Sequence, residues 1–170
     1  MIDQPIPVPV RQGNWFVLLD PSWTGSDPPA EAIVGGWMVA RDGGIGPFQP
    51  NPRYVPADES VPTDPIDALL RAAADGAAVG EQLVTTIRAS VVLIACDEKN
   101  QPIVMHAPDS VPSVLVATAE RHTVRPMTDR WWPVVGERLP RFVPHGVDVL
   151  LNPSSPARFR LLTEALRQPR

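Results

Sequence analysis

The sequence is poor in several residue types that carry common functions. Its 170 residues include one cysteine, one lysine and one tyrosine. A single cysteine excludes a disulfide framework within the chain. No apolar run approaches the roughly 18 residues of a membrane span, and Met1 to Pro5 carry an acid where a secretory signal needs positive charge. We therefore expect a cytoplasmic protein with no membrane span.

Recognisable catalytic and metal-binding motifs are also missing. His106, His122 and His145 stand far apart without a cysteine pair beside them, whereas zinc sites usually have short ligand spacings. The glycines fit neither a phosphate loop nor a dinucleotide fingerprint, and there is no Gly-x-Ser-x-Gly elbow. We expect no metal, no cofactor and no catalytic residue, and hence a protein that is not an enzyme.

One enzymatic alternative stays open, a thiol-dependent enzyme that uses Cys96 and His106. A polar turn separates the two residues, so they would be neighbours on antiparallel strands. Cys96, however, ends the apolar run Val91 to Ala95, and apolar surroundings raise the pKa of a thiol. This alternative is the weaker interpretation.

Charge is distributed unevenly along the chain. Residues 1–120 carry 6 basic and 15 acidic groups, whereas residues 121–170 carry 9 basic and 4 acidic groups. This asymmetry allows head-to-tail pairing of two copies, docking of a basic partner on the acidic part, or pairing of the acidic and basic parts within one fold. The arginines are scattered singly and are not interleaved with aromatics, so we expect no nucleic-acid partner.

Proline divides the chain into three parts. The 22 prolines exceed the usual share of about 5% and belong in turns, strand edges and connections. Residues 1–13 are predicted to be an extended lead-in. Residues 14–64 are predicted to be an N-terminal β block and a proline-rich strap, and residues 65–170 an α+β domain.

Apolar patterning and turn signals predict the individual elements. Strands are expected at residues 15–19, 34–39 and 45–48, and then at 91–95, 103–105, 114–117 and 147–151. Helices are expected at residues 65–76, capped by Thr63 or Asp64, at 80–89, at 136–143, and from Pro156 to the end. The predicted fold class is α+β: a mixed sheet of about four core strands covered by helices, with an N-terminal antiparallel hairpin element. We expect its exterior to carry function, with no deep pocket of converging ionisable groups.

Aromatic residues are the best candidates for contacts with a partner. Trp23 lies in a polar loop, and Trp131 and Trp132 cannot both face one side of a strand. Exposed tryptophan is a common anchor at protein interfaces. We select Trp23, Tyr54, Trp131 and Trp132 as partner-binding candidates, with acidic loops steering the partner.

Two groups of motifs resemble a known family. Gly146 to Pro153, followed by an Ala/Arg/Leu-rich segment, resembles the closing motif of SseB-type domains in actinobacteria. The upstream segments resemble the proteins called type VII secretion system-associated proteins, over roughly residues 14–168. The upstream motifs that carry this resemblance are Asp20-Pro21-Ser22-Trp23, Gly35-Gly36-Trp37, Phe48, Pro50-Asn51-Pro52, Tyr54 and Pro62-Thr63-Asp64-Pro65. Ser154 departs from the pattern, because a glycine commonly follows the proline there.

The resemblance implies a non-enzymatic accessory or adaptor protein that binds a secretion component or substrate. It supplies no catalytic residues for this chain. The acidic first 120 residues leave one rival from another binding class, an immunity protein that neutralises a secreted toxin. A homo-oligomer is also compatible with the charge distribution.

Overall fold

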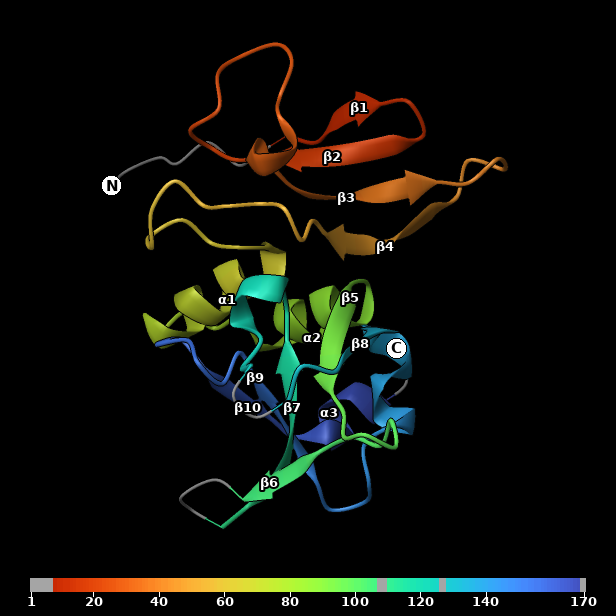
Figure 1. The fold of residues 1–170 in the computed structure, drawn as a ribbon, viewed down its shortest axis with the longest axis vertical. Coiled ribbons are helices and arrows are strands. Elements are labelled where there is room, and N and C mark those ends of the chain that lie inside the picture. The colour runs from red at the N-terminus through yellow and green to blue at the C-terminus, as the bar shows by residue number, and fades with distance from the viewer. Residues whose placement is uncertain (1–7, 107–109, 126–127, 169–170) are drawn as a thin grey trace.

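The computed structural model describes residues 8–106, 110–125 and 128–168, and its fold is α+β, the class predicted from the sequence. Two β-sheets are arranged along the long axis of the molecule (Figure 1). An N-terminal four-stranded sheet occupies one end, and a larger mixed sheet with its helices occupies the other. The strap, residues 51–64, lies between the two sheets in sequence and runs directly into the first helix.

The N-terminal sheet is antiparallel throughout. Its strands, in spatial order, are β1 (Val10–Gln12), β2 (Trp15–Leu19), β3 (Ile33–Val39) and β4 (Ile45–Pro50), with a short 3-10 turn η1 (Ala30–Ala32) before β3. Its small core consists of Val34, Phe48 and Tyr54. The ring of Trp37 meets that of Phe48 edge-on, with their centroids 4.9 Å apart.

The three predicted strands of this block are present, and a fourth strand lies within the predicted lead-in. Residues 10–12 pair with β2, with Val10 opposite Val17 and Gln12 opposite Trp15. Residues 10–12 of the predicted extended lead-in are thus the edge strand of this sheet, and all three are exposed. Residues 1–7 lie outside the described part of the chain.

The larger sheet is mixed and has six strands. The strands are β5 (Val91–Ala95), β6 (Val104–His106), β7 (Pro112–Ala117), β8 (Trp131–Val135), β9 (Asp148–Leu151) and β10 (Phe159–Leu161). Their order is β10-β9-β7-β5-β8, with β6 paired to β7 off this path. Only the β7–β9 pair is parallel among the described strands.

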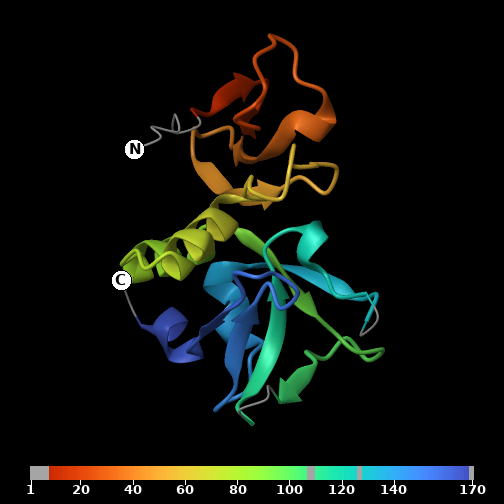
Figure 2. The same cartoon turned by 90° about the vertical axis from the view of Figure 1, so that its left-hand side faces the viewer.

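Helices and 3-10 turns build the main core against this sheet. They are α1 (Pro65–Ala74), α2 (Gly80–Arg88), η2 (Glu120–His122), η3 (Gly136–Arg141) and α3 (Thr163–Arg167). The core joins Ile66 and Leu70 of α1 and Leu83 and Ile87 of α2 to the sheet through fully buried valines, isoleucines and leucines of β5, β7 and β9. In Figure 2 the strap and α1 stand between the two ends of the molecule.

Two predictions in the second half of the chain are wrong. The sequence pattern assigns no element to residues 131–135, yet β8 pairs with β5 over its whole length, from Val91 opposite Val135 to Ala95 opposite Trp131. The single closing helix from Pro156 is instead β10 followed by the short α3. Pairing of Phe159 with Leu151 satisfies backbone groups that a helix would have had to satisfy locally.

Two smaller corrections concern local geometry. The segment after Gly136 is a 3-10 turn with Pro140 inside it, because proline cannot supply the donor that a continuing α-helix needs. The strand near residue 104 pairs with β7 and not in a regular hairpin with β5. In the described parts of the chain, no helix has both the length and the apolar character needed to cross a membrane.

Candidate functional site

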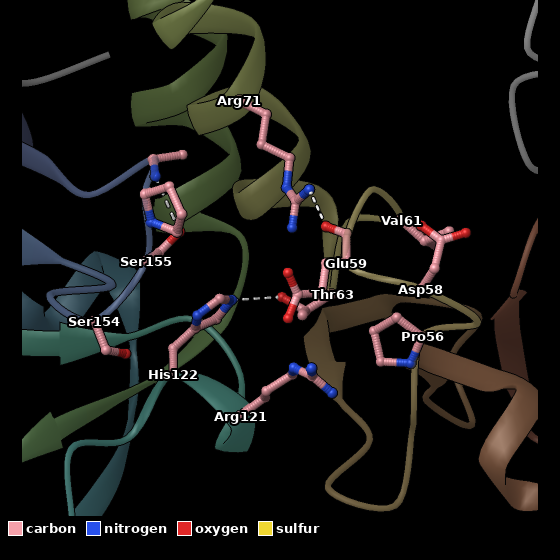
Figure 3. Close-up of a pocket in the computed structure, with 12 residues that line it drawn as sticks. Pro56, Asp58, Glu59, Val61, Thr63, Arg71, Arg121, His122, Ser154 and Ser155 are labelled. Atoms are coloured by element: carbon pink, nitrogen blue, oxygen red, sulfur yellow. Dashed lines mark hydrogen bonds between the residues drawn. The ribbon is translucent and has the colours of Figure 1, made fainter.

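A polar pocket of about 370 Å³ lies where the strap meets the larger unit. Strap residues between 56 and 63 form one wall, and Arg71 of α1 closes the top in the view of Figure 3. Arg121 and His122 of η2, together with the loop of residues 154–157 after β9, form the opposite side. The expectation of no pocket with converging ionisable groups is wrong, because the strap brings distant charged segments together. We call this cavity the strap pocket.

Asp64 is a buried residue next to Thr63, which lines the strap pocket. It is the N-cap of α1, and its Oδ1 accepts hydrogen bonds from the backbone N–H groups of Ile66 at 2.9 Å and Asp67 at 3.0 Å. Its Oδ2 accepts from the hydroxyls of Thr63 and Thr118, each at 2.7 Å. Capping of this kind is what the Thr-Asp-Pro segment predicts.

Burial and hydrogen bonding act in opposite directions on the Asp64 carboxyl. Burial raises the pKa of its carboxyl above the ordinary value and the charge of Asp67 adds to the rise, whereas the donated hydrogen bonds act against it. A protonated Asp64 would have to donate to one of the threonine oxygens instead of accepting from both. The backbone N–H groups of Ile66 and Asp67 can only donate, and the hydroxyls of Thr63 and Thr118 complete a set of four partners around the carboxyl.

The hydrogen-bond network continues to both sides of Asp64. Thr118 accepts from the side-chain amide of Asn152 at 2.9 Å, and the amide oxygen of Asn152 accepts from the backbone N–H of Thr118 at 2.9 Å. On the other side, Thr63 Oγ1 lies 2.8 Å from His122 Nε2. Since the Thr63 hydroxyl donates its only hydrogen to Asp64, His122 Nε2 must be the donor in this pair.

Burial lowers the pKa of His122 below its ordinary value. His122 is the last residue of η2 and is buried, so that a cationic ring is poorly solvated there. Asp67 and Asp64 act against this effect, whereas the charges of Arg71 and Arg121 add to it. His122 is therefore neutral at pH 7 and carries its hydrogen on Nε2.

Asp67 and Arg71 form a second layer of the network. Asp67 Oδ2 accepts from the backbone N–H of Thr63 and from Arg71 Nε, both at 3.0 Å. Arg71 Nη1 donates to the backbone oxygen of Glu59 at 2.7 Å, which ties the strap to α1. Asp67 Oδ1 is buried without a hydrogen-bond partner and lies 3.8 Å from His122 Nε2.

The direction of the hydrogen bonds decides what chemistry Thr63 can perform. A histidine that activates a hydroxyl must accept its proton, as in the serine hydrolase arrangement. Here His122 donates to Thr63 while the Thr63 hydroxyl donates to Asp64, so the proton faces away from the histidine. In this arrangement Thr63 bridges His122 and Asp64.

The other two chemical candidates, Cys96 and His106, differ in burial. The Cys96 side chain is buried at the end of β5, and desolvation raises the pKa of its thiol. His106 is on β6 with its side chain exposed. Among the described residues there is no group of three or more His, Cys, Asp or Glu side chains placed to hold a metal ion.

The four aromatic candidates do not form one surface. Trp23 is half-buried in the loop after β2, where its indole N–H donates to the backbone oxygen of Gly25 at 3.1 Å. Tyr54 is only 8% exposed, and its hydroxyl donates to Asp20 at 2.7 Å. Tyr54 therefore packs inside the N-terminal unit, and little of its surface is accessible to a partner.

Trp131 and Trp132 lie on β8, at one edge of the larger sheet. Trp131 is half-buried and donates its indole N–H to the backbone oxygen of Thr128 at 3.3 Å. Trp132 is 50% exposed. The alternation of a strand explains the difference, as the adjacent tryptophans point to opposite faces of the sheet.

Few residues of the strap pocket, or of the hydrogen-bond network beside it, are identifiable from the sequence. Local patterns indicate Thr63 and Asp64 only as helix caps and His122 only as a surface or loop histidine. Asn152 follows an apolar strand and adopts a positive φ of 47°, a conformation that asparagine tolerates, and this Asn-Pro signal marks only a strand end. No local pattern indicates that Asn152 meets Thr118.

Comparisons with protein-family models, with curated proteins and with solved structures find no match to this chain. Its function must therefore be inferred from the contacts described above and from the family resemblance of the sequence motifs.

Proposed function

We propose that this chain is a non-catalytic adaptor that binds a protein partner through Trp132 at the edge of the larger sheet. The observation that carries the proposal is the half-exposed Trp132 indole on an edge strand. The motif resemblance further suggests that the partner is a component or substrate of type VII secretion. Binding of this kind requires no catalytic group, which agrees with the direction of proton donation at Thr63.

The backbone of β8 favours recognition by side chains over strand addition. Cys96 N–H donates to the Arg130 oxygen at 2.9 Å, and Gly136 N–H donates to the Ser90 oxygen at 2.8 Å. Because antiparallel hydrogen bonds alternate, residue 133 must point its backbone away from β5. Proline at that position removes the central donor of the open edge, a known protection against pairing with another strand.

Trp132 is the side chain that this edge offers to a partner. It is opposite Ile94 of β5, which is fully buried, so it lies on the core face at the margin of the sheet. An indole combines a large apolar surface with a polar N–H, and its burial in a partner pocket supplies much of the energy of an interface. A partner with an apolar pocket or groove fits this position.

Photocrosslinking from position 132 tests the proposal. A photoreactive amino acid at residue 132 in cells that express the native gene is expected to crosslink a secretion component or substrate. The same probe at Arg41, in the exposed turn after β3, is the control for nonspecific capture. Equal products from both positions, or none from position 132, would contradict the proposal.

A matched pair of substitutions separates binding from folding. Phe142 is 48% exposed and lies after η3, so Phe142→Ala removes a similarly exposed aromatic ring elsewhere. We expect Trp132→Ala to abolish partner capture and Phe142→Ala to leave it unchanged, with the same thermal unfolding midpoint within a few degrees for both. Loss of capture in both variants would mean that Trp132 has no special role.

A further inference from the structure

We propose that the strap pocket is a binding site for a single oxyanion group, a phosphate or a carboxylate, held between Arg121 and Arg71. The site is independent of the proposed partner surface, because β8 contributes no residue to the lining of the pocket. Its central element is an arginine that the fold does not use.

Arg121 supplies the free positive charge. It lines the pocket, its side chain is exposed, and within residues 8–106, 110–125 and 128–168 its guanidinium has no hydrogen bond or ion pair. Figure 3 shows the side chain extending from η2 into the space between His122 and the strap. A guanidinium presents five donors in one plane, which matches the geometry of phosphate and carboxylate oxygens.

Arg71 supplies a second, fixed guanidinium. Its Nε is bound to Asp67 and its Nη1 to the Glu59 backbone oxygen, so its orientation is set by the strap and by α1. Its Nη2 has no bonded acceptor among the described residues. A donor that is already held in place loses little freedom when an anion binds.

The strap wall limits the charge of the ligand. The acidic residues Asp58 and Glu59 line the pocket on the side opposite η2. They disfavour a second anionic group, so the pocket fits one oxyanion on a neutral or cationic body. Its volume of about 370 Å³ lies at the lower end of the range for small-molecule sites.

His122 provides a reporter inside the same pocket. Its Nε2 is engaged with Thr63, and its ring lines the cavity beside Arg121. An anion that neutralises Arg121 and Arg71 removes two charges that oppose protonation of the ring. We therefore expect the ring C–H resonance of His122 to shift on binding and its titration midpoint to move upward.

Titration of the full chain with inorganic phosphate and, separately, with acetate tests the site. At pH 7 and constant ionic strength, we expect a saturable shift of the His122 resonance with at least one of the two anions. The anion that binds more tightly identifies the class of oxyanion, phosphate or carboxylate. No saturable shift with either anion would overturn the proposal.

Three substitutions define the specificity of this test. Arg121→Gln is expected to weaken binding about tenfold or more, because it removes the charge-assisted hydrogen bonds. Glu59→Gln is expected to tighten binding severalfold by removing a like charge. Arg41→Gln, at an exposed residue far from the pocket, should leave binding unchanged.

The pocket geometry requires that Arg121→Gln weaken anion binding and that Glu59→Gln strengthen it. Equal binding by Arg121→Gln and Arg41→Gln would overturn the proposal. Arg121 is exposed, so its replacement is not expected to unfold the chain, and Arg121→Lys supplies a second test. Lysine keeps the charge but lacks the planar donors, so this variant should bind more weakly than the original chain and more tightly than Arg121→Gln.

Discussion

His122 Nε2 lies 2.8 Å from Thr63 Oγ1, across 59 positions of sequence. This contact joins the end of the strap to η2, and through Thr63 it reaches the carboxylate that caps α1. The strap is thereby attached to the larger unit by a buried network of polar contacts, in which each carboxylate oxygen of Asp64 accepts two hydrogen bonds. Loss of any member leaves buried polar atoms without partners.

Asp64 should be the most sensitive member of this network. Asp64→Ala removes the helix cap and leaves the hydroxyls of Thr63 and Thr118 without their acceptor. We expect the free energy of unfolding to fall by roughly 3 kcal/mol, measured by urea denaturation. Asp75→Ala, at the exposed end of the same helix, is the matched control and should cost less than about 0.5 kcal/mol. A loss below about 1 kcal/mol for Asp64→Ala would contradict the assigned network.

The pH dependence of stability follows from His122. Its pKa is lower in the folded chain than in the unfolded chain, so the unfolded state binds more protons in mildly acidic solution. The stability from this group is therefore present above the unfolded value of about 6.5 and is lost as pH falls through the folded pKa. Asp64, Asp67, Arg71 and Arg121 all act on the ring, so the measurement must isolate its own contribution.

Comparison of the original chain with His122→Gln isolates this contribution. We expect the difference in unfolding free energy between the two proteins to decrease as pH falls below 6.5, because glutamine does not titrate. Chemical denaturation at several pH values from 5 to 8 measures it. A difference that stays constant, or that grows on acidification, would show that the ring is not held in its neutral form.

Tyr54 offers an optical test, since it is the only tyrosine in the sequence. Burial raises the pKa of its phenol, and the hydrogen bond to Asp20 and the negative charge of Asp20 raise it further. The folded chain should therefore show no tyrosinate absorbance near pH 10, where an unfolded tyrosine titrates. Its stability contribution is present below pH 10 and is lost as pH rises towards the folded pKa. Tyrosinate that appears near pH 10 in folded protein would refute this placement.

Tyr54→Phe measures the energy of the same contact. We expect the free energy of unfolding to fall by about 1 to 2 kcal/mol, since a buried hydrogen bond to a charged acceptor is lost. Ser22 still donates to Asp20 through its hydroxyl and its backbone N–H, which limits the loss. Thermal unfolding at pH 7 is the measurement, and a change below about 0.3 kcal/mol would show that the contact contributes little.

Local signals explain which elements are predictable from the sequence. Asp64 and Pro65 indicate the start of α1, because helix capping and the fixed φ of proline act within one turn of helix. The strands of the N-terminal sheet are likewise bounded by turn residues close in sequence. Each such feature is determined by neighbours that a window of a few residues contains.

The strap pocket and β8 depend on contacts between distant segments. Trp131 to Val135 has no clear alternation and contains Pro133, and only its pairing with β5, some 40 residues earlier, makes it a strand. His122 and Asn152 have no neighbour in sequence that indicates a buried partner. Their roles arise when β7, β9 and the strap meet, which a single sequence does not encode locally.

Gly136 tests the packing of β8 and η3 against α2. A Cβ atom at this position would lie 1.9 Å from the backbone oxygen of Ile87, much closer than atoms can approach. The backbone N–H of Gly136 also donates to Ser90 at 2.8 Å, so the residue cannot move away without breaking the ladder. We expect Gly136→Ala to lower the free energy of unfolding by roughly 3 kcal/mol or more, measured by urea denaturation.

Gly80→Ala is the matched control for this substitution. Gly80 begins α2, and a methyl group added there would meet no described atom within 4 Å. Alanine at this position reduces the entropy of the unfolded chain and favours the helix, so stability should be unchanged or rise by up to about 1 kcal/mol. A similar effect of both substitutions would mean that β8 and η3 are not packed against α2 as the structure places them. The placement of Trp132 on β8, and the partner surface proposed there, would then be unsupported.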